Sequence, residues 1–146
     1  MAKKLSDGYA SHKLLKGILI WVGLYHILLG FFGIVAKDIA VSFAKWFFNF
    51  NLTMTQEIAW ILNPFAAYVF IYGVFLVIAA TDPVKYKNII FAAVGLIAVR
   101  VIQRIIFFMF SPGGLIINAD PVRNMLAIIV PAAFGAAIAY LALKIK

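Results

Sequence analysis

The stretch that decides the fold is GILIWVGLYHILLGFFGIVA, residues 17–36, because it contains no acidic or basic side chain apart from one histidine. A transmembrane helix needs about 20 predominantly apolar residues to cross roughly 30 Å of hydrocarbon. Three further blocks have a comparable length and composition, at residues 58–80, 89–110 and 125–143. The sequence therefore predicts an all-α integral membrane protein, folded as a four-helix bundle.

The composition of the whole chain excludes a water-soluble fold. Of its 146 residues, 66% are hydrophobic and only 12% are charged, and the mean hydropathy is +1.06. A soluble domain of this size has to cover its core with more charged side chains. The first apolar block is too long for the apolar core of a cleaved signal peptide, so we expect it to remain as a span. We therefore expect residues 1–146 to form one transmembrane domain in contact with the lipid bilayer.

The net charge of +8 is distributed unevenly along the chain. In a four-span arrangement, one side receives only Lys37, Lys45 and Arg123. The side of the two termini receives eight lysines: Lys3, Lys4, Lys13, Lys16, Lys85, Lys87, Lys144 and Lys146. Cytoplasmic connections carry the excess of Lys and Arg, so we predict that both termini are cytoplasmic. The same lysines suit anionic lipid head groups, and their placement does not indicate a nucleic-acid-binding surface.

Cysteine and histidine usage limits the chemistry. The chain has no cysteine, which excludes disulfides, thiolate catalysis and iron–sulfur ligation. Its two histidines are His12 in the N-terminal tail and His26 within the first span, and their different depths prevent them from sharing one haem. We expect His26 to be a hydrogen-bonded core residue rather than a ligand of haem or of a pigment. We expect no metal site.

The connection between the first two spans, residues 38–56, mixes aromatic side chains with too many polar ones to form a span. We predict a partly helical, amphipathic segment that lies in the membrane interface. Near its end, the spacing of Thr53 and Gln56 predicts a capping box that starts the second span. Asp82 and Asp120 each precede a proline, which predicts the starts of the last two spans.

Small residues gather on single faces of two spans. In the first span, Gly23, Gly30 and Gly33 share a face with His26. The last span carries a second set, made of Ala132, Gly135, Ala136 and Ala139. Small residues allow two helix backbones to approach closely. We predict that these faces either pack within the bundle or contact a partner.

The third span contains three polar residues on one helical face, Arg100, Gln103 and Arg104. A charged side chain in mid-membrane costs at least ~2.5 kcal/mol on insertion scales, so each arginine needs a counter-group. We expect Glu57 to pair with Arg104. For Arg100 the candidates are backbone carbonyls, His26, Asn63, a lipid phosphate or an oxygen atom of a ligand. The predicted polar cluster, in the half of the bundle away from the termini, therefore contains Arg100, Gln103, Arg104, His26, Glu57 and Asn63.

Two interpretations of this polar cluster are open. In the first, Arg104 extends to the lipid head groups and Arg100 pairs with an acid on another subunit, so that the arginines only fix an assembly. In the second, the cluster binds a small molecule such as a quinone, whose carbonyls need hydrogen-bond donors beside an apolar sleeve. The donors would be Arg100, Gln103, His26 and either Tyr25 or Tyr68, with Glu57 as the proton acceptor.

The layout resembles that of the DoxX-like family, which are small four-helix membrane proteins of prokaryotes. The resemblance lies in the glycine-rich first span, the amphipathic connection and two further stretches. These are NPFAAYVFIYGVFLVIAATDPVKY, residues 63–86, and VRVIQR, residues 99–104. The resemblance implies a prokaryotic cytoplasmic membrane and a link to quinone-coupled sulfur oxidation or to membrane-associated redox complexes.

The sequence favours a non-catalytic accessory or assembly subunit of a larger membrane complex, with redox chemistry as the expected setting. The lack of nucleophile–base pairs and of redox ligands argues against an enzyme, and the small-residue faces suit contact with other subunits or with further copies of the chain. The alternative is a membrane protein that binds a quinone or another small molecule in the polar cluster. Transport of a small anion past the arginines is the least favoured function, because four helices rarely enclose a pathway without oligomerising.

Overall fold

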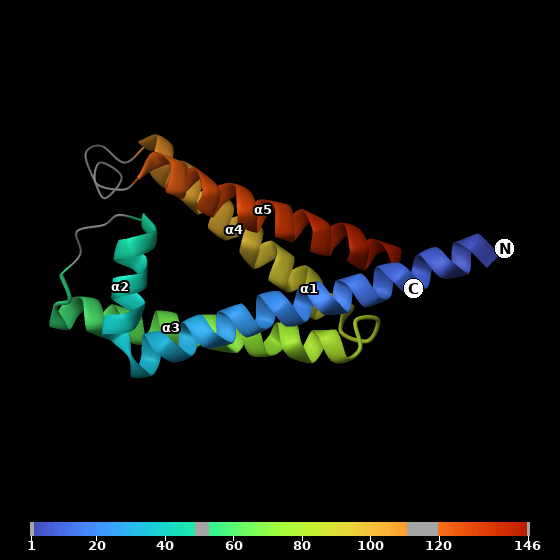
Figure 1. Cartoon of the computed structure of the whole chain (residues 1–146), viewed down its shortest axis with the longest axis horizontal. Helices are drawn as coiled ribbons and strands as arrows, with labels where there is room; N and C mark the ends of the chain where they lie inside the picture. The colour runs from blue at the N-terminus through green and yellow to red at the C-terminus, as the bar shows by residue number, and fades with distance from the viewer. Residues whose placement is uncertain (1, 49–52, 111–119, 146) are drawn as a thin grey trace.

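The computed structural model describes residues 2–48, 53–110 and 120–145, which contain five helices (Figure 1). These are α1 (Ala2–Val35), α2 (Lys37–Phe48), α3 (Gln56–Thr81), α4 (Lys87–Phe110) and α5 (Pro121–Lys144). Four of them are long and apolar enough to cross a membrane, namely α1 from Ala10 onward, α3, α4 and α5. The prediction of an all-α protein with four membrane-spanning helices is confirmed.

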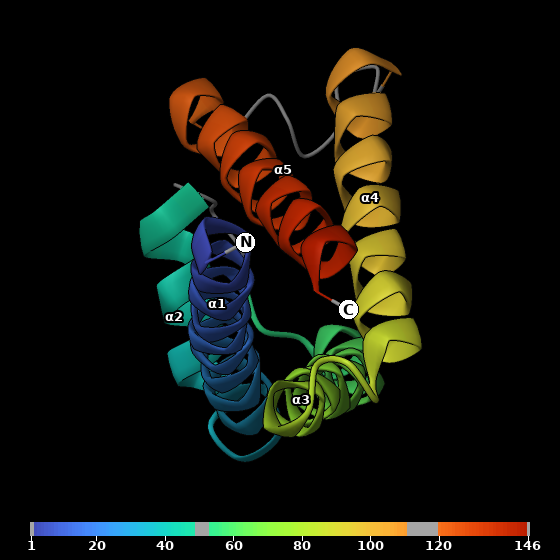
Figure 2. The same cartoon turned by 90° about the vertical axis from the view of Figure 1, so that its right-hand side faces the viewer.

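The four spans are arranged as two antiparallel pairs. α1 lies along α3, and α4 lies along α5 (Figure 1). The two pairs meet where α3 and α5 end, and they diverge toward α2 (Figure 1), so that α4 stands apart from α1 (Figure 2). We call the end where α3 and α5 finish the termini end, and the opposite end the α2 end. The divergence leaves most of α4 outside the core. The buried residues of α4 are only Ile90 and Ala93.

The core lies at the termini end, where all four spans come together. Its buried residues form one cluster: Leu15, Leu19, Leu76, Ala79, Ala80, Ile90, Ala93, Ile138, Leu141, Ala142 and Ile145. Two lysines satisfy the last carbonyls of the spans that end there. The Nζ of Lys16 donates to the carbonyl of Thr81 at 2.9 Å, and the Nζ of Lys87 donates to that of Ile145 at 3.0 Å. A cation at a helix C-terminus is favoured by the unpaired carbonyls and by the helix dipole.

Glycines bring the backbones of α1 and α3 into close contact. A Cβ atom placed on Gly30 would lie 2.5 Å from the backbone nitrogen of Phe70, and one on Gly73 would lie 2.5 Å from the carbonyl oxygen of Gly23. A Cβ on Gly33 would lie 2.6 Å from the Cβ of Ala66. Only residues without a side chain fit here, so the glycine face of α1 packs inside the bundle against α3.

The small residues of α5 are divided between the interior and the surface. Gly135 is buried, and a Cβ placed on it would lie 3.0 Å from the Cγ2 of Ile97 on α4. Ala139 is half-buried, whereas Ala132 and Ala136 are exposed. The contact between α4 and α5 is therefore less tight than the contact between α1 and α3, since a flexible side chain rather than a backbone atom is the nearest neighbour.

The short helix α2 runs across the ends of the spans (Figure 1). Val41 is buried on its inner side, whereas the polar side chains of Asp38, Ser42 and Lys45 are exposed, as predicted for an amphipathic segment. Arg123, in the first turn of α5, holds the far end of α2. Its Nη1 donates to the carbonyl of Trp46 and, at 3.4 Å, to the carbonyl of Phe47. These are last-turn carbonyls of α2, which have no partner within the helix itself.

The helix starts differ in part from the predicted ones. Asp120 is the N-cap of α5, as predicted, and its Oδ1 accepts from the nitrogens of Val122 and Arg123. The cap of α3 is Thr55, whose hydroxyl accepts from the nitrogen of Ile58 at 3.3 Å, so the predicted capping box at Thr53 is wrong. Asp82 is the C-cap of α3, and its Oδ1 accepts from the nitrogen of Lys85 in a turn that precedes α4. The prediction that Asp82 starts the third span is therefore also wrong.

Candidate functional site

Arg100 is an exposed cation in the middle of a span. It lies thirteen residues after Lys87 and ten before Phe110, about 20 Å and about 15 Å along the helix axis. Both distances place its Cα well inside a hydrocarbon layer of roughly 30 Å. Within the described parts of the chain, the structure gives its guanidinium no hydrogen bond and no ion pair. Arg100 therefore has donors available for a group that the described residues do not supply.

Besides Arg104 on its own helix, two polar side chains lie within electrostatic range of Arg100, namely His26 on α1 and Tyr72 on α3. Their rings meet edge to face with centroids 4.8 Å apart. His26 places its Nδ1 2.7 Å from the carbonyl oxygen of Val22, and Tyr72 donates its hydroxyl to the carbonyl of Ala93 at 3.3 Å. These backbone contacts fix both rings, so α1, α3 and α4 each contribute one polar side chain to the same region.

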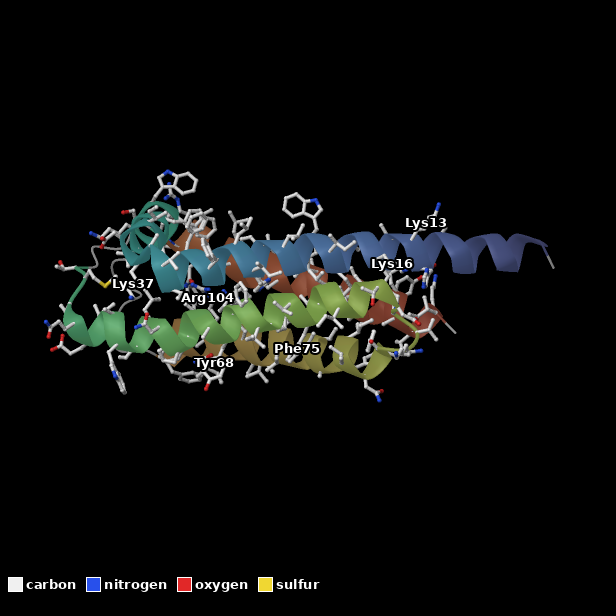
Figure 3. All side chains as sticks on the ribbon, turned by 90° about the horizontal axis from the view of Figure 1, so that it is seen from below. Lys13, Lys16, Lys37, Tyr68, Phe75 and Arg104 are labelled. Carbon is white, nitrogen blue, oxygen red and sulfur yellow. The ribbon has the colours of Figure 1, made fainter. Side chains whose placement is uncertain are left out.

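Arg104 lies one turn beyond Arg100 and has a different environment. Its Nε donates to the Oδ1 of Asn124 on α5 at 3.0 Å, and Asn124 is the one buried polar side chain among the described residues. The side chain of Arg104 is half-buried and is labelled near the α2 end in Figure 3. The partner of this Nε atom is thus an uncharged amide, not the predicted Glu57.

The acidic residues lie away from Arg100. The chain has five Asp and Glu residues in total, which are Asp7, Asp38, Glu57, Asp82 and Asp120. Four of them lie in the first turn of a helix, at a cap or in a turn, and Asp7 lies in the second turn of α1, outside its membrane span. Asp120 is within 3.6 Å of Arg123, where it forms an ion pair of the same turn. Among the described residues, the charge of Arg100 therefore has no acidic counter-charge at its own depth.

Of the remaining predicted site residues, Glu57 and Asn63 are not brought into this region. Glu57 and Asn63 are exposed on α3, roughly 22 Å and roughly 14 Å along the helix from Tyr72. Gln103 is exposed on α4. Of the two tyrosines considered as donors, Tyr25 packs edge to face on His26 at 5.1 Å between centroids, whereas Tyr68 is 76% exposed on α3.

The described residues contain no group of three His, Asp or Glu side chains placed to hold a metal ion. His26 is the one histidine at this depth, and its Nδ1 is already engaged with a backbone carbonyl. The polar chemistry at this level is therefore hydrogen bonding and charge, supplied by Arg100 with His26 and Tyr72 behind it.

Two contact residues were not identified from the sequence, Tyr72 and Asn124. A signal for Tyr72 exists, because it lies three residues after Val69 and four before Leu76, and both of these are buried on α3. The sequence indicates the role of Asn124 less clearly, because a single amide side chain in the first turn of a helix is usually exposed. No family model, curated protein or solved structure matches this chain.

Proposed function

We propose that this integral membrane protein is a non-catalytic accessory subunit, which binds another transmembrane protein through α4. The observation that carries the proposal is the placement of Arg100, an exposed cation at mid-span without an acid of its own chain at that depth. Buried charges in membranes are paired, because an unpaired one costs several kcal/mol. An acidic side chain on a partner helix would supply the missing counter-charge.

The charge argument favours a different protein over a second copy of this chain. A homo-oligomer would bring further arginines to the same depth, while every acid of each copy stays near a helix end or in the N-terminal part of α1. A lipid phosphate is disfavoured by depth, because Arg100 lies about 15 Å from the nearer end of α4. The partner we propose therefore carries an Asp or Glu within its own span.

The exposed face of α4 also suits a helix as neighbour. Leu96, Val99 and Ile102 are all more than half exposed, and a Cβ placed on Gly95 would meet nothing within 4 Å. Small residues beside a polar group are the features that hold helices together in lipid. In this proposal, the partner packs along Gly95 and Val99 and reaches Arg100 with its acid.

Native mass spectrometry of the protein released from its own membrane tests the proposal. We expect a larger assembly that is lost in Arg100→Gln and retained in Arg100→Lys, because lysine keeps the charge. Lys37→Gln is the matched control, since it removes one cation at the start of α2. A stable monomer in the wild type, or an assembly that survives Arg100→Gln, would refute the proposal.

Cysteine cross-linking then locates the interface. The chain has no cysteine, so Val99→Cys introduces a unique thiol on a residue that is 61% exposed. We expect a cross-link from Val99→Cys to the partner, and none from Phe75→Cys, which lies on α3 and is 50% exposed. Equal cross-linking from both positions would show that α4 has no special role.

Binding of a quinone is a second candidate function, favoured by the convergence of His26, Tyr72 and Arg100 from three spans. Arg100 offers several N–H donors to a carbonyl oxygen, and its neighbours Val99 and Val101 on α4 are apolar. A short-tailed benzoquinone titrated into the purified protein should quench tryptophan fluorescence with saturation. Binding that is unchanged in Arg100→Leu would exclude this site. The DoxX-like family and its redox setting likewise stay a proposal, to be tested by the identity of the partner.

A further inference from the structure

We infer that a surface groove between α1 and α5 binds one acyl chain of an anionic phospholipid, whose phosphate contacts Lys13. The groove has a volume of about 490 Å³, is almost entirely apolar and lies at the termini end. Its lining residues are Lys13, Leu14, Gly17, Ile18 and Trp21 of α1 and Phe134 of α5. The inference is independent of the proposed function, because α4 contributes no residue to the groove.

Gly17 leaves the space that an acyl chain would fill. A Cβ placed on Gly17 would meet no atom within 4 Å, whereas one on Gly30 would meet backbone at 2.5 Å. Glycine is less favourable than alanine inside a helix. At Gly30, the close packing against α3 explains why glycine is needed. The described residues show no such reason at Gly17. A ligand that lies against the helix backbone would account for the absence of a side chain there.

The groove has a charged residue at one end and apolar residues along the rest, which matches the charged head and apolar chain of a phospholipid. Lys13 lies at one end, and Trp21, which is 75% exposed, lies eight residues further, about 12 Å along α1. One turn from Lys13, the Nζ of Lys16 donates to the carbonyl of Thr81, the last residue of α3. Lys13 is therefore at the level where the spans finish and lipid head groups begin, while Gly17 and Trp21 face hydrocarbon.

Further cations at the same end favour an anionic head group. Figure 3 shows Lys13 and Lys16 near the termini end, far from Lys37 and Arg104. Lys85, Lys87 and Lys144 also belong to this end, in the turn before α4, at its start and at the end of α5. Cations close to a membrane surface attract acidic lipids. A zwitterionic lipid would gain much less from this arrangement, so we assign the groove to a lipid with net negative charge.

Native mass spectrometry of the full chain, from micelles that contain equal amounts of phosphatidylglycerol and phosphatidylcholine with the same acyl chains, tests the inference. We expect the wild type to retain one phosphatidylglycerol. Lys13→Gln should weaken this retention about fivefold, as expected for one juxtamembrane cation, and Lys13→Arg should restore it. Gly17→Leu should reduce retention of both lipids, because its side chain occupies the groove.

Two control variants match these changes. Lys37→Gln removes a cation at the other end, and Gly95→Leu adds a side chain where a Cβ likewise meets nothing within 4 Å. Both should retain phosphatidylglycerol as the wild type does. Equal retention of the two lipids by the wild type, or unchanged retention in Lys13→Gln, would overturn the inference. Lys13 is exposed, so its variant decides the question even if Gly17→Leu does not fold.

Discussion

The close contact of α1 and α3 predicts that alanine at Gly30 destabilises the protein. A Cβ on Gly30 would lie 2.5 Å from the nitrogen of Phe70 and 2.7 Å from the carbonyl oxygen of Ala66. Ordinary van der Waals contact begins at 3.4 Å, so the helices must separate by about 1 Å at this point. All the nearest atoms belong to backbone, and no side-chain rotation can relieve the clash.

The magnitude follows from two opposing effects. Overpacking of a well-packed contact costs about 1–3 kcal/mol. Replacing glycine by alanine inside a helix contributes about 1 kcal/mol in the opposite direction. At Gly95 the first effect is absent, because a Cβ there meets nothing within 4 Å. Gly30→Ala should therefore be less stable than Gly95→Ala by about 1–3 kcal/mol.

Equilibrium unfolding in mixed micelles, followed by tryptophan fluorescence, measures this difference in the free energy of unfolding. Gly135→Ala adds an intermediate case, since its nearest neighbour is the flexible side chain of Ile97 at 3.0 Å. We expect the order of stability to be Gly95→Ala, then Gly135→Ala, then Gly30→Ala. Equal unfolding free energies for Gly30→Ala and Gly95→Ala would refute the packing described for α1 and α3.

Three further predictions concern polar contacts. A double-mutant cycle with Arg104→Leu and Asn124→Leu, measured by unfolding in micelles, should give a coupling energy of about 0.6 kcal/mol and at most ~1.7 kcal/mol. Additive effects of the two substitutions would contradict the hydrogen bond. Arg123→Gln should loosen the end of α2, because hydrogen bonds to charged groups contribute about 1.5–3 kcal/mol, and faster amide exchange confined to α2 would report it. Tyr72→Phe should lose about 0.5–1.5 kcal/mol, the net value of its bond to Ala93, and a larger loss in thermal melting would indicate a further role of the hydroxyl.

The number and type of the spans could be predicted because membrane insertion depends on local composition. Four apolar blocks of about 20 residues have few alternatives to helices in lipid, since every backbone group must be satisfied within the segment. The contact face of α1 followed from the spacing of Gly23, Gly30 and Gly33 for the same reason, as only helix periodicity was needed.

Which residues contact each helix face depends on the tertiary arrangement of the helices, which the local sequence pattern does not predict. Arg104 has the buried amide of Asn124 beside it, whereas the more obvious charge of Glu57 lies at an exposed helix start. The cap is Thr55 rather than Thr53 because α3 begins at Gln56, directly after Thr55. Ala132 and Ala136 are exposed because the α4–α5 pair diverges from the rest, and a small-residue pattern cannot predict such a divergence.

The pairing of spans matches the order in which the chain is made. α1 and α3 are consecutive spans, as are α4 and α5, so each helix pair forms between neighbours in synthesis. The glycine contacts of the first hairpin involve only α1 and α3, so this hairpin can close before α4 has left the ribosome. The second hairpin joins the first at the termini end, where the core contains buried residues of both hairpins. The spans thus form two hairpins, and the connection between Thr81 and Lys87 is the place where one hairpin ends and the next begins.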